Sequence, residues 1–82
     1  MRIDKLLFFL RFAKSRTLAQ NWSESGHIRV NGRRVEKASL SITIGDVITM
    51  PVGEVVVTLK LLSMPFRRGP AHEAQLCYQL ID

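Results

Sequence analysis

Lysine and arginine side chains, which can bind phosphate groups, are concentrated in the first 37 residues of this 82-residue chain. This segment holds nine of the twelve basic residues and three acidic ones, a net charge of +6, whereas residues 38–82 have a net charge of −1. Such asymmetry is typical of nucleic-acid-binding proteins. Ordinary solvated surface charge is the less favoured alternative, because few acidic partners are present to neutralise the excess. The nine basic residues are Arg2, Lys5, Arg11, Lys14, Arg16, Arg29, Arg33, Arg34 and Lys37.

The sequence Lys14-Ser15-Arg16 has the chemistry of a phosphate-binding helix start. Ser15 is a favourable N-cap residue, and the free amide N–H groups of a helix N-terminus attract anions. Arg16 and Gln20 are four residues apart and would share one helix face. Arginine also matches the geometry of phosphate through parallel hydrogen bonds. We therefore expect Lys14 and Arg16 to dominate binding at this point.

Two helices are expected to position these residues. The first has the i, i+3, i+4, i+7 spacing of an apolar stripe, formed by Ile3, Leu6, Leu7 and Leu10. The second is expected from about Arg16 to Ser25, with Gly26 as its C-terminal cap. It would bury Leu18, Ala19 and Trp22. Trp22 could alternatively stack on a base, but its place on the apolar face favours the core.

A hairpin is the clearest local prediction. Asn31-Gly32 is the preferred pair for a two-residue turn, and it lies between Ile28-Arg29-Val30 and Arg33-Arg34-Val35. The tight reversal would bring Arg29, Arg33 and Arg34 close to the helices. The hairpin therefore extends the basic surface.

The rest of the chain predicts a sheet and a short helix. Leu40, Ile42 and Ile44 alternate with polar residues as in a half-buried strand. Turns at Gly45-Asp46 and from Pro51 to Gly53 would separate two further strands, Val47 to Met50 and Glu54 to Leu62. A closing helix from Pro70 to about Leu80 would place Ala71, Ala74, Cys77 and Tyr78 at helical spacing.

These elements predict an α+β fold. Two N-terminal helices, arranged like a helix-turn-helix, would pack on a small antiparallel sheet that contains the Asn-Gly hairpin, with a short C-terminal helix. The length and the 46% apolar content fit a single globular domain of residues 1–82. The apolar run Leu6 to Leu10 is too short for a secretory signal, and nothing approaches a membrane span. Cys77 is the only cysteine, which fits a reducing compartment, and we expect a cytoplasmic protein.

Catalytic and metal-binding patterns are not found. Asp4 could act as an acid or base, but a carboxylate at a helix start is expected to pair with Arg2 or Lys5. His72 and Cys77 are five residues apart, a poor spacing for metal ligands. The sequence has no Gly-rich phosphate loop, no paired catalytic carboxylates and no Ser-His-Asp pattern. We expect no catalytic residue, no metal and no cofactor.

Four spaced motifs resemble the RNA-binding domain named after ribosomal protein S4, the S4 domain. They are Arg2-x-Asp4-Lys5-x-Leu7, Lys14-Ser15-Arg16-x-x-Ala19, Gly26-His27-Ile28-x-Val30-Asn31-Gly32-x-x-Val35 and Ile44-Gly45-Asp46. They cover about residues 2–48, the motif core, and leave the remaining sheet and the C-terminal helix to residues 49–82. Further along, Arg67-Arg68, Glu73-Ala74 and Tyr78 resemble the segment that follows this domain in the ribosome-associated heat-shock protein 15 family and in similar short ribosome quality-control proteins.

The resemblance implies a non-enzymatic protein that binds structured RNA. It implies ribosomal RNA of the large subunit and also tRNA as partners, in the recycling or quality control of stalled subunits that carry a nascent chain. We expect no membrane partner, and a monomer. The predicted RNA-binding residues are Arg2, Lys5, Arg11, Lys14, Ser15, Arg16, Gln20, His27, Arg29, Asn31, Arg33, Arg34 and Lys37, with auxiliary contacts from Arg67 and Arg68.

Three other functions stay open at this point. S4 domains are fused to pseudouridine synthases and to tyrosyl-tRNA synthetases, so the chain could be the RNA-targeting partner subunit of a separate RNA-modifying enzyme. It could be a protein–protein interaction module that binds an acidic partner. Duplex DNA is a remote option, because no helix presents Asn or Gln residues poised to read bases.

Overall fold

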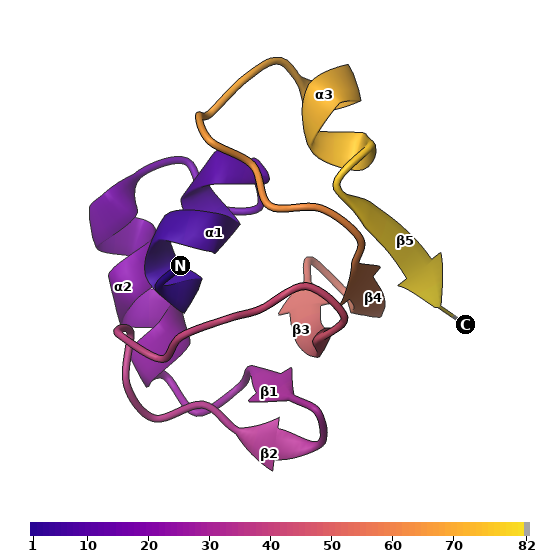
Figure 1. Ribbon diagram of the computed structural model, residues 1–82. Helices are drawn as coiled ribbons and strands as arrows, with labels where there is room; N and C mark the ends of the chain where they lie inside the picture. Colours follow the sequence, from indigo (N-terminus) through magenta and orange to yellow (C-terminus); the bar gives the residue numbers. More distant parts are fainter. Residues whose placement is uncertain (82) are drawn as a thin grey trace.

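Two short helices lie side by side at the N-terminal end of the molecule (Figure 1). The computed structural model describes residues 1–81, and Asp82 lies outside the described part. Helix α1 spans Ile3–Phe9, and helix α2 spans Arg16–Glu24. The predicted apolar stripe of α1 is fully buried at three of its positions, Ile3, Leu6 and Leu7, and almost fully buried at Leu10. The periodicity of the sequence therefore identified the face of α1 that packs on the core.

Helix α2 has the predicted caps. Ser15 precedes it in an extended conformation, and Gly26 follows it with a φ of +86°, a left-handed conformation that glycine adopts without strain. The expectation for Leu18 was wrong, because its side chain is exposed. The buried line of α2 runs through Ala19 and Ser23, so Leu18 lies at the solvent edge of that face.

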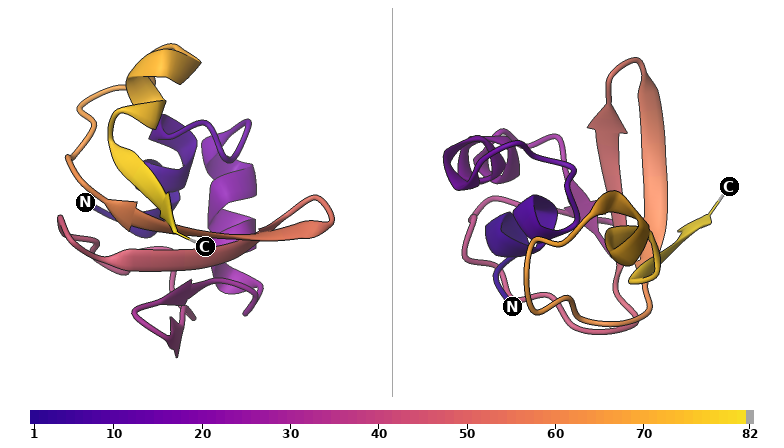
Figure 2. Two further views of the ribbon diagram at one scale, coloured as in Figure 1. Left: turned by 90° about the vertical axis from the view of Figure 1, so that its right-hand side faces the viewer. Right: turned by 90° about the horizontal axis from the view of Figure 1, so that it is seen from above.

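Five antiparallel strands form the sheet in the order β2-β1-β3-β4-β5. Their bounds are β1 Arg29–Val30, β2 Arg33–Arg34, β3 Val47–Val52, β4 Val55–Leu61 and β5 Tyr78–Ile81. Ile48 of β3 lies opposite Leu59 of β4, and both side chains are completely buried beneath the helices' apolar residues. The predicted α+β architecture, helices on a small antiparallel sheet, is confirmed (Figure 2).

The Asn31-Gly32 turn is confirmed and is tied to a second turn. Asn31 and Gly32 have φ angles of +53° and +82°, the left-handed values that this hairpin type requires. The Asn31 side-chain amide donates to Asp46 at 3.0 Å, and its carbonyl oxygen accepts from the backbone N–H of Val47 at 2.9 Å. The hairpin is therefore held to the start of β3 by side-chain hydrogen bonds as well as by the strand ladder.

The strand expected across residues 40–44 was wrong. This segment forms only an isolated bridge between Arg2 and Ser41, although Ile42 is buried. Its backbone hydrogen bonds go to the N-terminus: the Ile3 N–H donates to Leu40 at 2.8 Å, and the Ile42 N–H donates to Met1 at 2.7 Å. The segment pairs with the N-terminal residues at a few points instead of lying along a strand of the sheet, so it forms no continuous strand pairing.

Two boundaries in the second half also differ from the predictions. Strand β3 continues through Pro51 and Val52, and the turn lies at Gly53-Glu54. Helix α3 spans only Ala71–Gln75, so the expected helix to about Leu80 is wrong after Gln75, and the chain from Tyr78 to Ile81 forms β5. The backbone edge of β4 at Thr58 to Leu61 pairs with β5, and these hydrogen bonds replace those of a longer helix. Within residues 1–81, no helix combines the length and apolarity that a bilayer crossing requires.

Candidate nucleic-acid interface

A buried carboxylate, that of Asp4, joins the two helices and fixes two arginines. Arg2 donates from Nε and Nη2 to the two carboxylate oxygens, each at 3.0 Å, and Nη2 of Arg16 lies 3.5 Å from Oδ2. The Asp4 side chain is only 3% exposed, whereas the two arginine side chains remain about half exposed. We call Arg2, Asp4 and Arg16 the Asp4 clasp. The pairing with Arg2 was predicted, whereas no local pattern indicated the contact with Arg16 on the other helix.

The Asp4 carboxylate stays ionised in this position. Burial by itself raises the pKa of Asp4, but hydrogen bonds from Arg2 and from the Lys5 backbone N–H, with the charges of Arg16 and Arg2, outweigh it. The pKa of Asp4 is therefore below its ordinary value of 3.8. An ionised Asp4 binds the Nε–Nη2 edge of Arg2 and attracts Nη2 of Arg16, and the exposed half of each arginine side chain remains accessible to a phosphate.

The N-terminus of α2 lies next to the clasp. The Ser15 hydroxyl accepts a hydrogen bond from the Leu18 N–H at 3.1 Å, so this side chain is engaged as a cap. Among the described residues, no acceptor is assigned to the backbone N–H groups of Arg16 and Thr17. Lys14 and Gln20 are exposed, one just before the helix and one a turn further along it. The predicted helix start thus combines backbone donors, the helix dipole and side-chain cations.

The hairpin carries a second basic group at the other end of α2. Arg29 and Arg34 lie opposite each other on β1 and β2, and Arg33 is exposed beside them. Arg34 pairs weakly with Glu36 at 3.5 Å, and its side chain also passes close to Gly26 at the C-terminal end of α2. Both members of the ion pair are more than half exposed, so it neutralises little of the local charge.

Helix α2 connects these two basic groups. Its N-terminal end lies at the Asp4 clasp, and its C-terminal end leads to the β1–β2 hairpin (Figure 1). The nine residues of the helix span about 13 Å. His27 and Lys37 are exposed in the segments that flank the hairpin. A shallow cavity of about 410 Å³ lies beside the hairpin and is lined in part by Arg34 and Lys37.

Several predicted residues are engaged inside the molecule. Arg11 donates to the Gly69 carbonyl at 2.9 Å, and the Asn31 amide group forms the two bonds described above. Arg68 donates from Nε to the Phe8 carbonyl at 3.1 Å, and Arg67 binds both carboxylate oxygens of Glu73. These contacts give the four residues structural roles whether or not they also contact RNA. The Lys5 ammonium group lies over the Phe9 ring, 5.3 Å from its centroid.

The described residues contain no cluster of three or more His, Cys, Asp or Glu side chains that could hold a metal ion. The basic groups of this surface supply hydrogen-bond donors and positive charge, which suit an anionic polymer.

The S4 domain family matches residues 1–48 of the chain. Two curated relatives are a heat shock protein 15 homolog of Haemophilus influenzae and heat shock protein 15 of Escherichia coli K12, each 34% identical over 79 residues, or 96% of this chain. The small ribosomal subunit protein uS4 of Gloeobacter violaceus is 42% identical over 67 residues, which is 78% of this chain and 32% of that protein. The chain spans about 60% of the length of the heat shock protein 15 relatives.

A solved structure of Vibrio cholerae heat shock protein 15, described as trimeric, is similar over 99% of this chain and 81% of that chain, with a TM-score of 0.93 and 38% identity. The similarity therefore includes the second half of the fold, beyond the four motifs. Since the family match covers more than half of the sequence, the chain belongs to the S4 family of RNA-binding domains.

Proposed function

We propose that residues 1–82 act as a single, non-enzymatic domain that binds structured RNA through the surface running from the Asp4 clasp to the β1–β2 hairpin. The observation that carries this proposal is the clasp itself. A carboxylate that is almost completely buried holds Arg2 and Arg16 beside the N-terminus of α2, with half of each side chain exposed. The arrangement presents preorganised donors to phosphate oxygens, which lowers the entropic cost of binding.

We infer that the RNA is ribosomal. The relatives that support this inference are a small ribosomal subunit protein and heat shock protein 15, and the similarity to heat shock protein 15 extends over 96% of this chain. The resemblance to the heat-shock family favours the large subunit, with contacts to ribosomal RNA and to tRNA, in the recycling or quality control of stalled subunits. Action on the ribosome would place the protein in the cytoplasm.

Co-sedimentation with purified ribosomal subunits tests this function. The wild-type protein should sediment with large subunits, and a variant carrying Lys14→Ala and Arg16→Ala should remain in the supernatant. Lys60→Ala is the matched control, because Lys60 is an exposed lysine on β4, outside the basic surface. Unchanged sedimentation of the double variant would show that the assigned surface is wrong.

A pull-down from nuclease-treated extract tests the alternative function. Retention of the protein by one RNA-modifying enzyme in nuclease-treated extract, without ribosomal RNA, would favour the partner-subunit function instead. The expected monomer also stays a prediction. Because the Vibrio relative is described as trimeric, analytical ultracentrifugation of this chain, alone and with RNA, is the measurement that decides its oligomeric state.

A further inference from the structure

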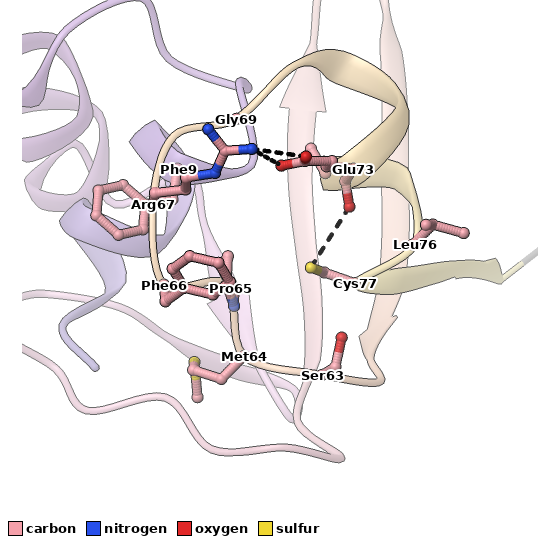
Figure 3. Close-up of a pocket in the computed structure, with 11 residues that line it drawn as sticks. Phe9, Ser63, Met64, Pro65, Phe66, Arg67, Gly69, Glu73, Leu76 and Cys77 are labelled. Atoms are coloured by element: carbon pink, nitrogen blue, oxygen red, sulfur yellow. Dashed lines mark hydrogen bonds and ion pairs between the residues drawn. The ribbon is translucent and has the colours of Figure 1, made fainter.

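A hollow of about 290 Å³ opens beside α1, in a part of the molecule that the basic surface does not include. Its walls come from α1, from the loop that follows β4, and from α3 with the two residues after it. Figure 3 shows the Phe9 and Phe66 rings on one side of the hollow, and Glu73 and Cys77 on the other. Most of the lining is apolar, and Arg67 and Glu73 contribute charged groups.

Phe66 has the most exposed large apolar side chain that the structure describes. It is 87% exposed, and Leu76 on the same hollow is also largely exposed. Neither side chain contributes much to the core, so the fold does not explain why they are apolar. Exposed apolar side chains that line a hollow are typical of a binding site. An exposed aromatic ring in particular offers a flat surface for stacking.

The loop that carries Phe66 is fastened to both neighbouring helices. The Arg68 guanidinium lies 4.8 Å from the centroid of the Phe8 ring and donates to the Phe8 carbonyl, and Arg11 donates to the Gly69 carbonyl. Arg67 binds Glu73 of α3 at 2.7 and 2.9 Å. A ligand that stacks on Phe66 would therefore meet a loop that is already ordered, which reduces the entropy lost on binding.

The charges around the hollow indicate what it binds. Lys5 lies over the Phe9 ring, which lines the hollow, and Arg67 is half exposed at its rim. Glu73, the acidic residue of the lining, is paired with Nη2 of Arg67, so the charges of this pair largely offset each other and Lys5 supplies the uncompensated positive charge next to the Phe9 wall. An exposed aromatic ring on a hollow whose Phe9 wall carries the Lys5 cation matches a nucleotide, whose base is flat and whose flanking phosphates are anionic. A second copy of the chain is the other occupant that the test below distinguishes.

We propose that this hollow binds one unstacked base of the RNA, stacked on Phe66, with the neighbouring phosphates near Lys5 and Arg67. The inference rests on the proposed function and adds a substrate class to it: RNA with an unpaired loop or bulge, held by its duplex portion on the basic surface. Sequence-tolerant stacking on aromatic side chains is a common way to bind unpaired bases.

The test compares two RNA probes, a hairpin with unpaired loop bases and a blunt duplex made from the same stem. Phe66→Ala should weaken hairpin binding about tenfold, the effect of losing one stacked base, and leave duplex binding unchanged. Phe66→Trp should preserve hairpin binding because it retains an aromatic face. Val56→Ala is the matched control, since Val56 is an exposed apolar residue at the β3–β4 hairpin, which projects away from α3 (Figure 2).

A direct readout uses 2-aminopurine in the hairpin loop. Binding of the wild-type protein should change the fluorescence of 2-aminopurine, because the base stacks on Phe66, and binding of the Phe66→Ala variant should not. Equal hairpin affinity of wild type and Phe66→Ala, or an equal loss for both probes, would overturn the inference and leave the proposed function intact. The inference would also fail if Phe66→Ala altered only self-association in ultracentrifugation. If the wild-type protein bound neither probe, the proposed function would fail as well.

Discussion

Among residues 1–81, Asp4 and Glu73 each form an ion pair with an arginine of a separate element, and the two carboxylates differ in burial. In the basic half, Asp4 is 3% exposed and is shared by Arg2 and Arg16. In the near-neutral half, Glu73 is 43% exposed and binds Arg67 alone, at the shorter distance of 2.7 Å. A buried carboxylate cannot be satisfied by water and depends on its arginines, whereas an exposed one can exchange its partner for solvent. Distance alone would predict that the Arg67–Glu73 pair contributes more to stability than the Asp4 clasp, whereas burial predicts the reverse.

The two halves also differ in how many of their basic side chains are free to bind RNA and how many are paired within the protein. Arg67 and Arg68 look like an RNA-binding pair in the sequence, yet they fasten the loop before α3 to Glu73 and to Phe8. In the first half, basic residues outnumber acidic ones by six, so most of them cannot be neutralised within the molecule. We therefore place the main RNA-binding surface in the first half and give the second half a supporting role.

The largest expected effect is the salt dependence of the basic half as a whole. If about six phosphates are contacted, RNA affinity should fall about a thousandfold between about 50 and 200 mM salt, because counterions are released on binding. Fluorescence anisotropy with a fragment of ribosomal RNA measures this slope. The Lys14→Ala, Arg16→Ala variant should have a shallower slope by about 1.8 in log affinity against log salt. An affinity that is independent of salt would contradict the electrostatic mechanism.

The next effect comes from breaking the Asp4 clasp with Asp4→Asn. This change places an amide donor against arginine donors, and should lower the free energy of unfolding by about 1.5–3 kcal/mol, measured by urea denaturation. The affinity of the folded variant for RNA should also fall, by about fivefold for the loss of ~1 kcal/mol of preorganisation, although the substitution makes the net charge more positive.

A fall in RNA affinity would show that Asp4 acts by positioning the arginines, because its effect on net charge alone would raise the affinity. Glu24→Gln is the control, because Glu24 is an exposed acid in the last turn of α2 and its substitution adds the same charge. It should leave stability nearly unchanged and slightly strengthen RNA binding. If Asp4→Asn also strengthened binding, the clasp would not position the arginines.

Much of the scaffold was predictable because its signals are local. The stripe of α1, the Ser15 and Gly26 caps of α2 and the Asn31-Gly32 turn each depend on a few neighbouring residues. The wrong predictions are at places where distant segments compete. The residues around Ile42 alternate like a strand, but their hydrogen bonds go to the N-terminus. Tyr78 has helical spacing to Ala74 and Ala71, but its backbone pairs with the edge of β4 as part of β5.

The candidate site was predictable in composition and much less so in geometry. The clustering of Arg2, Lys14 and Arg16 is visible in the sequence. The contact of Arg16 with Asp4 depends on how α1 and α2 pack, which no local pattern encodes. Phe66 was not singled out either, since an aromatic residue next to Pro65 has the same local signal whether it enters the core or remains exposed. Its exposure is a tertiary property.

A smaller effect is expected from pH. Asp4 has a pKa below 3.8 in the folded protein because of its arginines, so the folded state binds fewer protons than the unfolded state as the solution is acidified. Its contribution to stability should be complete well above pH 3.8 and should be lost as the pH falls toward and through the lowered pKa. Asp46, whose pKa is lowered by the Thr43 backbone N–H and by Asn31, contributes in the same direction.

The measurement is the urea midpoint of wild type and Asp4→Asn as a function of pH. The difference between the two proteins should be constant near neutral pH and should narrow below about pH 4. A difference that did not change with pH would mean that the charge of Asp4 contributes nothing and that its burial alone matters.

The smallest effect should come from breaking the exposed pair with Glu73→Gln. Because both side chains are about half exposed, solvent can replace the partner, and the free energy of unfolding should fall by less than about 1 kcal/mol. Binding of duplex RNA should change little, since the basic half is intact and Arg67 gains a free charge. Urea denaturation and anisotropy beside Asp4→Asn give the comparison directly. A loss as large as that of Asp4→Asn would show that the Arg67–Glu73 pair holds the loop as firmly as the buried clasp holds the helices, and that burial of the carboxylate is not what distinguishes the two regions.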